Sequence, residues 1–453
     1  MDNGFHRETY NRWQQEKHSG QIVLRGRILK TFREKRRLVL IMQAGEYGSR
    51  FRLLLEEEQP SYEDMRKLHL SGALMAVRAS VQDTGADMVT ARIEESMIVS
   101  LPELPAGQRA LSLTGGRGTF EKAFYHLKLC NDERTILYLR LRDKVFRDLR
   151  AFLNEGDFCE CVIPALQKNY YGGDANPFTT HVNFAHRDYY LKPNSNVAFL
   201  LHLAGGMEKM YEISDYFRNG GVDSRHSVPY CALELYAAYF DYEEIRELAW
   251  QIFRRIARSV SEWHVRRRTE TGEQSGEITQ ESPAVETTFH RLLSEKCGEN
   301  ADQAGIRALR LRLTGESSDS AADNTGWVYR WMKKELFRGI EGPCAVTDLP
   351  AGVSPLIRTQ PDRPEFLKRG YIIWGGSNVI EFFEGENDCG TALGRLQEQE
   401  SGQSGADVRR DYRALEHAFA LGIPPYASLT VSLDRMIAIG MGNVPVSTYR
   451  MDL

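Results

Sequence analysis

The stretch from Tyr211 to Asp241, YEISDYFRNGGVDSRHSVPYCALELYAAYFD, decides the fold. Tyr211, Ile213 and Phe217 predict one buried face of a strand that leads to Arg218, because side chains alternate between the two faces of a sheet. The Asn-Gly-Gly run that follows Arg218 is typical of a turn. A second, returning strand is predicted to carry Tyr230, Glu234 and Tyr236.

Two antiparallel strands joined by a polar loop would bring Arg218, Arg225 and His226 near one another. This cluster suits a polyphosphate, because guanidinium groups pair bidentately with phosphate oxygens. Glu234 and Tyr236 stand two residues apart on one strand, face the same side, and could hold an ammonium group. An exposed Arg/His loop beside a salt-bridged glutamate is the alternative interpretation.

The chain resembles a known family in several motifs. "FRN-x-G", then "RH", then "ELYxAYxDYEE" is similar to motif 2 of the class II aminoacyl-tRNA synthetases, in the lysyl branch. Gly422–Met436 (GIPPYASLTVSLDRM) is similar to motif 3, and Cys161-Val162-Ile163-Pro164 stands in the place of motif 1. Thr347–Arg358 (TDLPAGVSPLIR) is similar to a proline-rich strand of that branch. The resemblance covers most of the chain and implies an α+β fold, with an antiparallel sheet, flanking helices and an N-terminal β-barrel of the oligonucleotide-binding (OB) type.

The resemblance implies an ATP site. Arg218 would bind the α-phosphate and the amino-acid carboxylate, where charge develops as an adenylate forms. Arg225 and His226 would meet the distal phosphates. Tyr230 would stack on adenine, and Arg435 of "LDR" would cover the other face of the base. Arg218 and Arg435 would thus be the catalytic residues.

An amino-acid pocket follows from the same resemblance. Glu234 and Tyr236 would receive a lysine-like ammonium group, and Gly172 lies in the loop that approaches the substrate backbone. Asn196 stands where the family has the glutamate that takes the α-amino group. This exchange indicates an α-amine that is absent, masked or differently placed. Glu381 lies close to the same pocket.

Several positions depart from the family pattern. Gly220 replaces a glutamate of motif 2, and Tyr371 and Asn378 replace two acidic positions of the magnesium segment. Glu381 could substitute only with a shifted loop, so we expect weak magnesium binding and leave the metal open. The glycines of motif 3 are also lost. Side chains would narrow the space against the ligand at three positions, Ser428, Thr430 and Ser432.

The sequence predicts that residues 1–108 form the barrel and that residues 115–453 form the synthetase-type domain. A short helix is expected at Phe5–Lys17 and another near Tyr62–Leu68. Five short strands are expected at Ile22–Leu24, Leu38–Met42, Phe51–Leu55, Ala73–Ala79 and Met88–Val99. In the larger domain, helical spacing predicts Leu137–Asn154, Asp241–Val260 and Tyr412–Phe419, and alternation predicts a last strand at Ala427–Leu433. Ser-, Thr- and Glu-rich residues 265–325 are interpreted as a partly mobile insertion with a helical island at Thr287–Leu293.

The barrel carries a basic patch that could meet a phosphate backbone. A solvated strand and loop is the alternative interpretation. In the family an aromatic residue and a glutamine read the anticodon, and here Leu38 and Arg52 stand in those places. Phe32 could supply a ring, from a loop. The patch consists of Arg25, Arg27, Lys30, Arg33, Lys35, Arg36 and Arg37.

Composition bounds the class of protein. The chain is 42% hydrophobic and 26% charged, and its apolar runs fall short of the roughly 20 residues that span a bilayer. The first residues lack the apolar core of a secretory signal. The seven cysteines form no C-x-x-C pair, so a reducing cytosol fits best. With a net charge of −4, any RNA contact would come from a local patch.

We therefore expect a cytoplasmic enzyme that activates a lysine-like or modified amino acid with ATP and passes the acyl group to a tRNA, a protein or a small molecule. The alternative is a non-catalytic paralogue that acts as a ligand sensor, regulatory subunit or RNA-binding partner. A housekeeping lysyl-tRNA synthetase is the third interpretation. Motif 1 builds a two-fold dimer in the family, so a homodimer is expected, with its interface around Phe158–Leu166.

Overall fold

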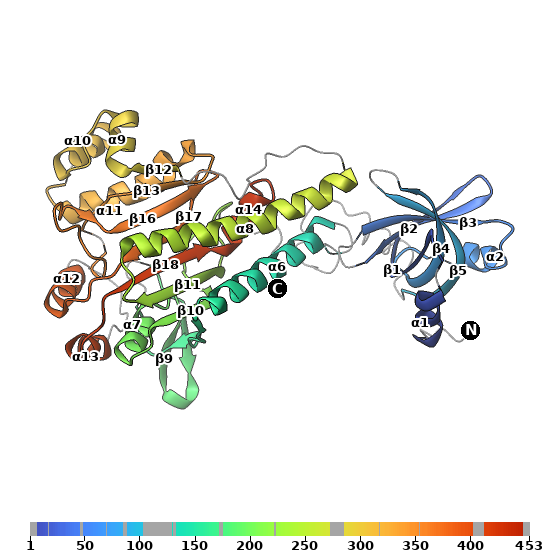
Figure 1. Ribbon diagram of the computed structural model, residues 1–453, viewed down its shortest axis with the longest axis horizontal. Helices are drawn as coiled ribbons and strands as arrows, with labels where there is room; N and C mark the ends of the chain where they lie inside the picture. Colours follow the sequence, from blue (N-terminus) through green and yellow to red (C-terminus); the bar gives the residue numbers. More distant parts are fainter. Residues whose placement is uncertain are drawn as a thin grey trace. The chain divides into compact units, whose positions relative to one another are not determined.

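The computed structural model of the chain resolves two compact units, one with an N-terminal barrel and one with a large sheet and its helices (Figure 1). The predicted domain boundary at residues 108–115 lies outside the described part of the chain. The described residues are 7–16, 18–45, 49–68, 70–84, 88–102, 129, 133–171, 175–221, 223–271, 285–316, 318–352, 354–401 and 412–446.

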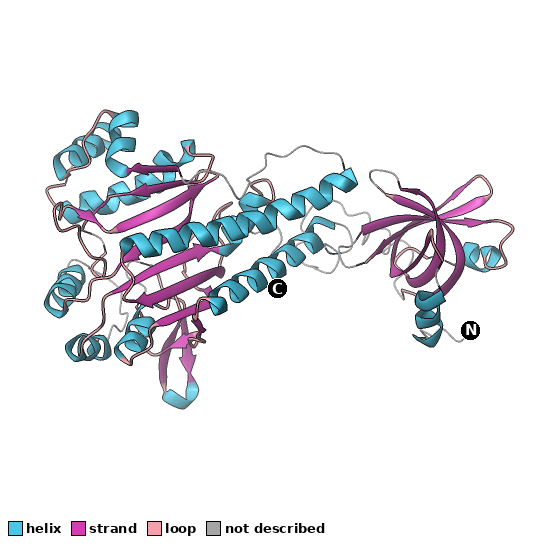
Figure 2. Ribbon diagram, viewed as in Figure 1, coloured by secondary structure: helices cyan, strands magenta, loops and turns pink. Residues whose placement is uncertain are grey.

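The N-terminal unit is a closed barrel in the strand order β1-β2-β3-β5-β4 (Figure 2). Parallel pairing of β3 with β5 closes it, and the inward-facing aliphatic side chains of the strands fill its core. This confirms the predicted OB-type barrel. Its elements are α1 (Arg7–Glu16), β1 (Gln21–Glu34), β2 (Arg37–Ala44), β3 (Ser49–Glu56), α2 (Tyr62–Lys67), β4 (Leu74–Thr84) and β5 (Val89–Ser100).

Strand β1 is much longer than the predicted Ile22–Leu24, because basic residues alternate with apolar ones and continue the pairing with β2 and β4. Phe32 therefore lies on β1 and not in a loop, with 36% of its surface exposed. Lys30 Nζ lies 5.6 Å from the centroid of its ring. The sequence-based expectation for Phe32 was wrong, because it ended the strand at the first charged residues.

Acidic side chains next to β3 neutralise much of the predicted basic patch. Arg33 and Arg36 lie 3.5 and 3.0 Å from Glu57, and Arg37 lies 3.7 Å from Glu56. Such exposed pairs add little stability, but they reduce the net positive charge that a nucleic acid would meet. At the two positions that replace the anticodon-reading residues, Leu38 is buried in the barrel and Arg52 lies 2.5 Å from Glu34.

The second unit is built on an eight-stranded sheet in the order β12-β13-β16-β17-β18-β11-β10-β6. The six central strands pair antiparallel, and the two edge strands, β12 and β6, pair parallel with their neighbours. The strands are β6 (Cys159–Glu160), β10 (Lys209–Tyr216), β11 (Tyr230–Ala238), β12 (Val285–Thr288), β13 (Cys344–Thr347), β16 (Arg369–Trp374), β17 (Ser377–Glu384) and β18 (Tyr426–Ser432). Smaller pairings join β7 (Leu166–Gln167), β8 (Thr179–Val182) and β9 (Arg187–Leu191), and join β14 (Leu349–Pro350) to β15 (Phe366–Leu367).

Helices divide between the two faces of this sheet. The long α8 (Tyr242–Thr271) crosses one face (Figure 1), where Tyr242 packs on Phe382 and Phe253 packs on Trp374. The opposite face receives α7 (Asn196–Ala204), α12 (Cys389–Ser401) and α13 (Arg413–Leu421) at one end, around the buried ring of Tyr236. Further helical elements include α6 (Glu133–Glu155), η1 (Asn183–Ala185), η3 (Phe337–Gly339) and α14 (Leu433–Gly440). The face opposite α8 is therefore the one left to bind a ligand.

The segment interpreted as a partly mobile insertion is folded where it is described. It forms α9 (Phe289–Cys297), α10 (Gln303–Thr314) and α11 (Ala321–Trp331), followed by the π-helical turn η2 (Met332–Leu336). Many of its polar residues are helix caps. Thr288, Asp302 and Ser320 each accept a backbone N–H at the start of a helix, and apolar residues of the three helices share one buried cluster. The predicted island at Thr287–Leu293 combines the end of β12 with the start of α9.

Among the described residues, the helices are too short or too polar to cross a membrane.

Candidate active site

A transverse row of side chains runs across the middle of the large sheet. In register order it consists of Tyr371, Glu381, Thr430, Glu234 and Glu212, on β16, β17, β18, β11 and β10. Residues that oppose each other in antiparallel strands point to the same face, so these five side chains share one face. That face is opposite to the one covered by α8. We call these residues the polar row.

Motif 3 lies within this face. Thr430 stands between Glu381 and Glu234 in the polar row, and Ser428 stands beside Tyr236 one step along. Ser432 pairs with Ala232 on the same face. The three side chains that replace the family's glycines therefore all project toward the site, as the sequence predicted.

Glu234 is the carboxylate at the centre of β11, and 3% of its surface is exposed. Its Oε2 accepts a hydrogen bond of 3.0 Å from the backbone N–H of Ser195, at the start of α7. Within the described residues its Oε1 is buried and has no hydrogen-bond partner. Burial raises the pKa of Glu234 to about 7. An ammonium group would supply both the missing donor and the charge that stabilises the ionised form.

A buried ion pair between Lys192 and Glu212 lies next to Glu234 and is connected to it through Ser195. Lys192 Nζ lies 2.6 Å from Glu212 Oε1 and also donates to the Ile163 carbonyl at 3.0 Å. The other oxygen of Glu212 accepts from the Ser195 hydroxyl at 2.6 Å, so one serine links both carboxylates. Sequence analysis missed this pair. The sequence predicts the side of β10 with Tyr211 and Ile213 as the buried one, whereas Glu212, on the other side, is buried as well.

Aromatic rings form the wall beside Glu234. The Tyr236 ring is stacked between Phe199 and Tyr426, at centroid distances of 5.0 and 5.8 Å. Tyr236 therefore lies on the same face as Glu234, as predicted, and is fully buried. Asn196 is the first residue of α7, next to the serine that holds Glu234. Gly172, predicted to approach the substrate backbone, lies outside the described residues.

Arg218 and Tyr230 meet at the loop end of the β10–β11 hairpin. The guanidinium carbon of Arg218 lies 5.4 Å from the centroid of the Tyr230 ring. Both side chains donate to the Pro193 carbonyl, at 3.4 and 3.3 Å. The hairpin thus presents a cation and an aromatic ring together, with Tyr230 on the same face of β11 as Glu234 and four residues before it.

The two other predicted phosphate residues are placed differently. Arg225 donates to the Gly376 carbonyl at 3.0 Å, in the turn between β16 and β17. Its own carbonyl accepts from Arg435 at 3.2 Å, so Arg225 and Arg435 belong to one cluster. Burial, with the neighbouring Arg225, lowers the pKa of Arg435 to about 10. His226 is exposed and lies 2.9 Å from Asp223.

The positions of the family's magnesium ligands hold no acid. Asn378, at one of them, accepts a 2.6 Å hydrogen bond from Arg435 through its backbone carbonyl and a 3.3 Å bond through its side chain. Tyr371, at the other, is buried under Arg369 and Lys333. Glu381 forms a 2.5 Å ion pair with Arg369.

Magnesium therefore does not fit this site. The ion prefers carboxylate oxygens in near-octahedral geometry, whereas here the remaining carboxylate is already paired with a guanidinium. Across the described part of the chain, His, Cys, Asp and Glu side chains form no group of three that could hold a metal ion.

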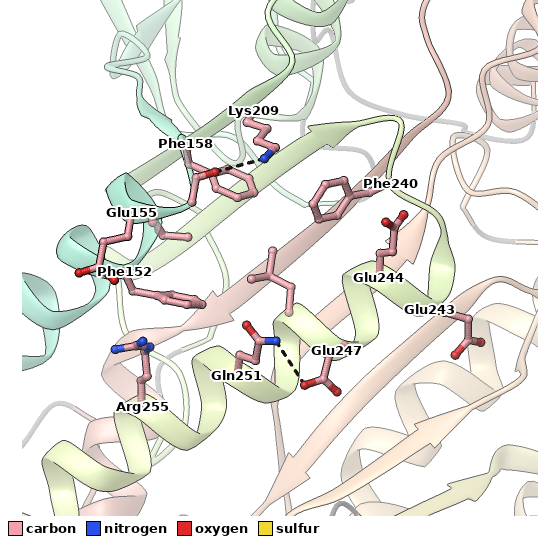
Figure 3. Close-up of a pocket in the computed structure, with 13 residues that line it drawn as sticks. Phe152, Glu155, Phe158, Lys209, Phe240, Glu243, Glu244, Glu247, Gln251 and Arg255 are labelled. Atoms are coloured by element: carbon pink, nitrogen blue, oxygen red, sulfur yellow. Dashed lines mark hydrogen bonds between the residues drawn. The ribbon is translucent and has the colours of Figure 1, made fainter.

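A separate cavity of about 650 Å³ lies between α6 and α8. Figure 3 shows the rings of Phe152, Phe158 and Phe240 around it, with Lys209 between the latter two. Lys209 Nζ lies 5.6 and 5.7 Å from those two ring centroids. Four glutamates also line the cavity, so it does not suit a polyphosphate. They are Glu155, Glu243, Glu244 and Glu247.

Comparison with known proteins bears on the sheet and its motifs. The family model described as tRNA synthetases class II (D, K and N) matches residues 120–448. The chain belongs to this family. The match includes the polar row, the β10–β11 hairpin and the motif 3 strand β18, and it confirms the resemblance and the fold class stated from sequence.

The curated relatives are bacterial lysine–tRNA ligases. The chain is 27% identical to that of Tolumonas auensis over 69% of its own length and 62% of the relative's, so it spans less than two thirds of that protein. It is 26% identical to that of Chromohalobacter salexigens over 81% of this chain and 73% of the relative. For the ligase of Synechococcus sp. strain CC9902 the identity is 24%, over 92% of this chain and 84% of the relative.

Proposed function

We propose that this class II synthetase relative activates an amino acid with ATP as its adenylate and passes the acyl group to an acceptor. One observation carries the proposal: Glu234, a buried carboxylate with an unpartnered oxygen, lies on the same hairpin as Arg218 and Tyr230. The hairpin combines a pocket for a cationic side chain with groups suited to an α-phosphate and an adenine ring.

The substrate is a lysine-like or modified amino acid in this proposal. Glu234 and Tyr236 bind its distal ammonium group, Arg218 stabilises charge at the α-phosphate, and Arg435 covers the face of the adenine opposite Tyr230. Asn196 is a neutral amide where the family has a carboxylate, which disfavours a charged α-ammonium group. An α-amine that is masked or displaced, as in an N-acylated or β-amino acid, fits this neutral position better.

The acceptor is a tRNA, a protein or a small molecule. The paired acidic residues around Arg33, Arg36 and Arg37 support a weaker contact with tRNA than the basic patch alone would imply. Phe32, on the surface of β1 beside Lys30, is a stacking platform that a single-stranded nucleic acid could use. The barrel therefore favours RNA among the acceptors.

A non-catalytic ligand sensor is the second candidate. The observation that favours it is the loss of carboxylates at Tyr371 and Asn378, because an adenylate-forming site without its metal ligands still binds ATP. We also propose a homodimer. Val162 and Leu166, in the segment of motif 1, are 89% and 46% exposed and offer an apolar surface to a second copy.

Amino-acid-dependent ATP–pyrophosphate exchange tests the enzyme proposal. Lysine, its β- and N-acylated relatives and the other amino acids would be compared, with wild-type protein and Arg218→Ala. We expect exchange with one cationic amino acid and a loss of at least about 100-fold in Arg218→Ala, since removing a preorganised oxyanion donor costs that order in rate. Binding of ATP without exchange for any amino acid would favour the sensor. Exchange that survives Arg218→Ala would place the chemistry elsewhere.

A further inference from the structure

Lys333 is a cation that sequence analysis did not single out. It lies on the π-helical turn η2, a distortion that is rare in proteins and frequent at functional sites. Its Nζ lies 5.5 Å from the centroid of the Tyr371 ring, in the polar row. The side chain is exposed to solvent, yet burial of its ammonium group among protein atoms lowers its pKa to about 8. The Lys333 ammonium group therefore stands beside the polar row, and we call its surroundings, with Tyr371, Arg369, Arg218 and Arg435, the cationic cluster.

Other cations lie near Lys333. Arg369 lies over Tyr371 at 5.2 Å and over Tyr329 at 5.1 Å, so its guanidinium is held between two rings. Arg218 and Arg435 are close enough to Lys333 to disfavour its charged form. Glu381 lies among these cations and is paired with Arg369. The cationic cluster therefore holds more positive than negative charge before any ligand binds.

Hydrogen-bond donors in the cationic cluster are also unused. Within the described residues, the Nε groups of Arg369 and Arg435 are buried without a hydrogen-bond partner. Buried donors of charged groups are rarely left unpaired, because each costs free energy that a ligand would recover. Two such donors, on β16 and on α14, flank the positions Tyr371 and Asn378 where the family binds its metal.

These observations indicate that cationic side chains take the place of the magnesium ion. Magnesium neutralises phosphate charge and bridges phosphate oxygens in most ATP sites. Here the acidic ligands of the metal are gone and a lysine and an arginine stand around the same positions. A divalent cation placed among them would be repelled, whereas a polyphosphate would be attracted.

We propose that the cationic cluster binds the triphosphate of ATP without a divalent cation, with Lys333 and Arg369 in place of the metal. The proposal rests on the proposed use of ATP and extends it. Lys333 contacts the phosphate chain directly through its ammonium group. Arg369, which forms an ion pair with Glu381, contributes positive charge and donates a hydrogen bond from its Nε group to the phosphate chain.

Calorimetric titration with ATP tests the proposal, in excess EDTA and in excess magnesium. The proteins are wild type, Lys333→Gln and, as a matched control, Lys334→Gln, whose exposed lysine is the next residue of η2. We expect wild type to bind ATP in EDTA within about twofold of its affinity in magnesium. Lys333→Gln should bind at least about tenfold more weakly in both buffers, which corresponds to about 1.4 kcal/mol, and Lys334→Gln should match wild type.

The outcomes separate this proposal from the proposed function. Binding that requires magnesium would overturn the metal-free site and leave an ATP-dependent enzyme in place. Equal affinity of wild type and Lys333→Gln in EDTA would remove Lys333 from the site. Absence of ATP binding both in EDTA and in magnesium would overturn the metal-free site and the proposed use of ATP together. Circular dichroism and a thermal melt of each variant verify that a weaker affinity does not reflect unfolding.

Discussion

At the scale of single residues, Glu234 has a carboxyl group whose charge state changes near neutral pH. Its pKa of about 7 means that roughly a tenth of the protein carries an ionised Glu234 at pH 6, and about nine tenths at pH 8. Binding of a cationic amino acid requires the ionised form. We therefore expect affinity to rise about tenfold between pH 6 and pH 8, as measured by calorimetry.

Glu234→Gln is the matched variant for this prediction. The amide can still accept the hydrogen bond from Ser195 but cannot ionise. Its affinity for the cationic amino acid should be lower than that of wild type at pH 8 and should not change with pH. An affinity of wild type that is flat between pH 6 and pH 8 would contradict the assignment of Glu234 as the ammonium-binding group.

Ionisation of Glu234 should also affect stability: the free energy of unfolding should fall as pH rises, whereas the affinity for the cationic amino acid should rise. The native carboxyl binds its proton up to about pH 7, whereas an unfolded glutamate loses it near pH 4.5. Between these values the native state holds more protons, so the free energy of unfolding falls as pH rises. In Glu234→Gln the free energy of unfolding should therefore fall less between pH 5 and pH 8 than in wild type. Urea titrations at the two pH values would measure the difference.

Residue-level prediction from sequence succeeded where a motif met a strand pattern. Glu234, Tyr236 and Tyr230 were placed on one strand because two-residue alternation fixes the face of each side chain. Lys192 and Lys333 were missed for a different reason. Their partners, Glu212 and Tyr371, are distant in sequence, and no local pattern distinguishes a lysine that enters a site from one that stays in solvent.

On the scale of elements, the polar segment at residues 285–324 is held together by its helix caps. The Thr288 hydroxyl accepts the Arg291 N–H at 3.1 Å, at the start of α9. Thr288→Ala should lower the stability of this helix by about 1 kcal/mol and speed hydrogen exchange along Phe289–Cys297. Ser294→Ala, an exposed mid-helix position, is the control and should leave exchange unchanged or slower. Rapid exchange of α9 in wild type would contradict a folded segment.

The composition of this segment explains why sequence analysis took it for a mobile insertion. Serine, threonine and aspartate lower the average hydropathy, yet Thr288, Asp302 and Ser320 are used at helix starts. The apolar residues between them are few but recur at helical spacing, which a composition average hides. By contrast, the start of α8 was predicted to within one residue, because its apolar stripe is regular there, but the helix continues beyond the predicted end at Val260 to Thr271.

For the whole molecule, fold class followed from the resemblance and from the sheet-forming pattern, and both are confirmed. What sequence could not supply was the pairing of β3 with β5 that closes the barrel, or the order of strands in the large sheet. Both depend on contacts between residues far apart in the chain. The assembly of two copies is likewise not contained in one chain's pattern.

The proposed homodimer gives a prediction at this scale. Val162→Glu places a charge on a side chain that is 89% exposed in the single chain and apolar in the proposed interface. We expect sedimentation to show dimers for wild type and monomers for Val162→Glu, since burying an unpaired charge is costly. Leu313→Glu, an exposed leucine on α10, is the control and should remain dimeric. A wild-type monomer would contradict the proposal.

The central claim is that ATP and a cationic amino acid bind on the face of the sheet opposite α8. A crystal structure of wild type soaked with ATP and the amino acid that supports exchange, in the absence of metal, tests it most directly. We predict the α-phosphate at Arg218, the ammonium group at Glu234 and the distal phosphates at Lys333. Density for either ligand in the cavity between α6 and α8, with the polar row empty, would contradict it.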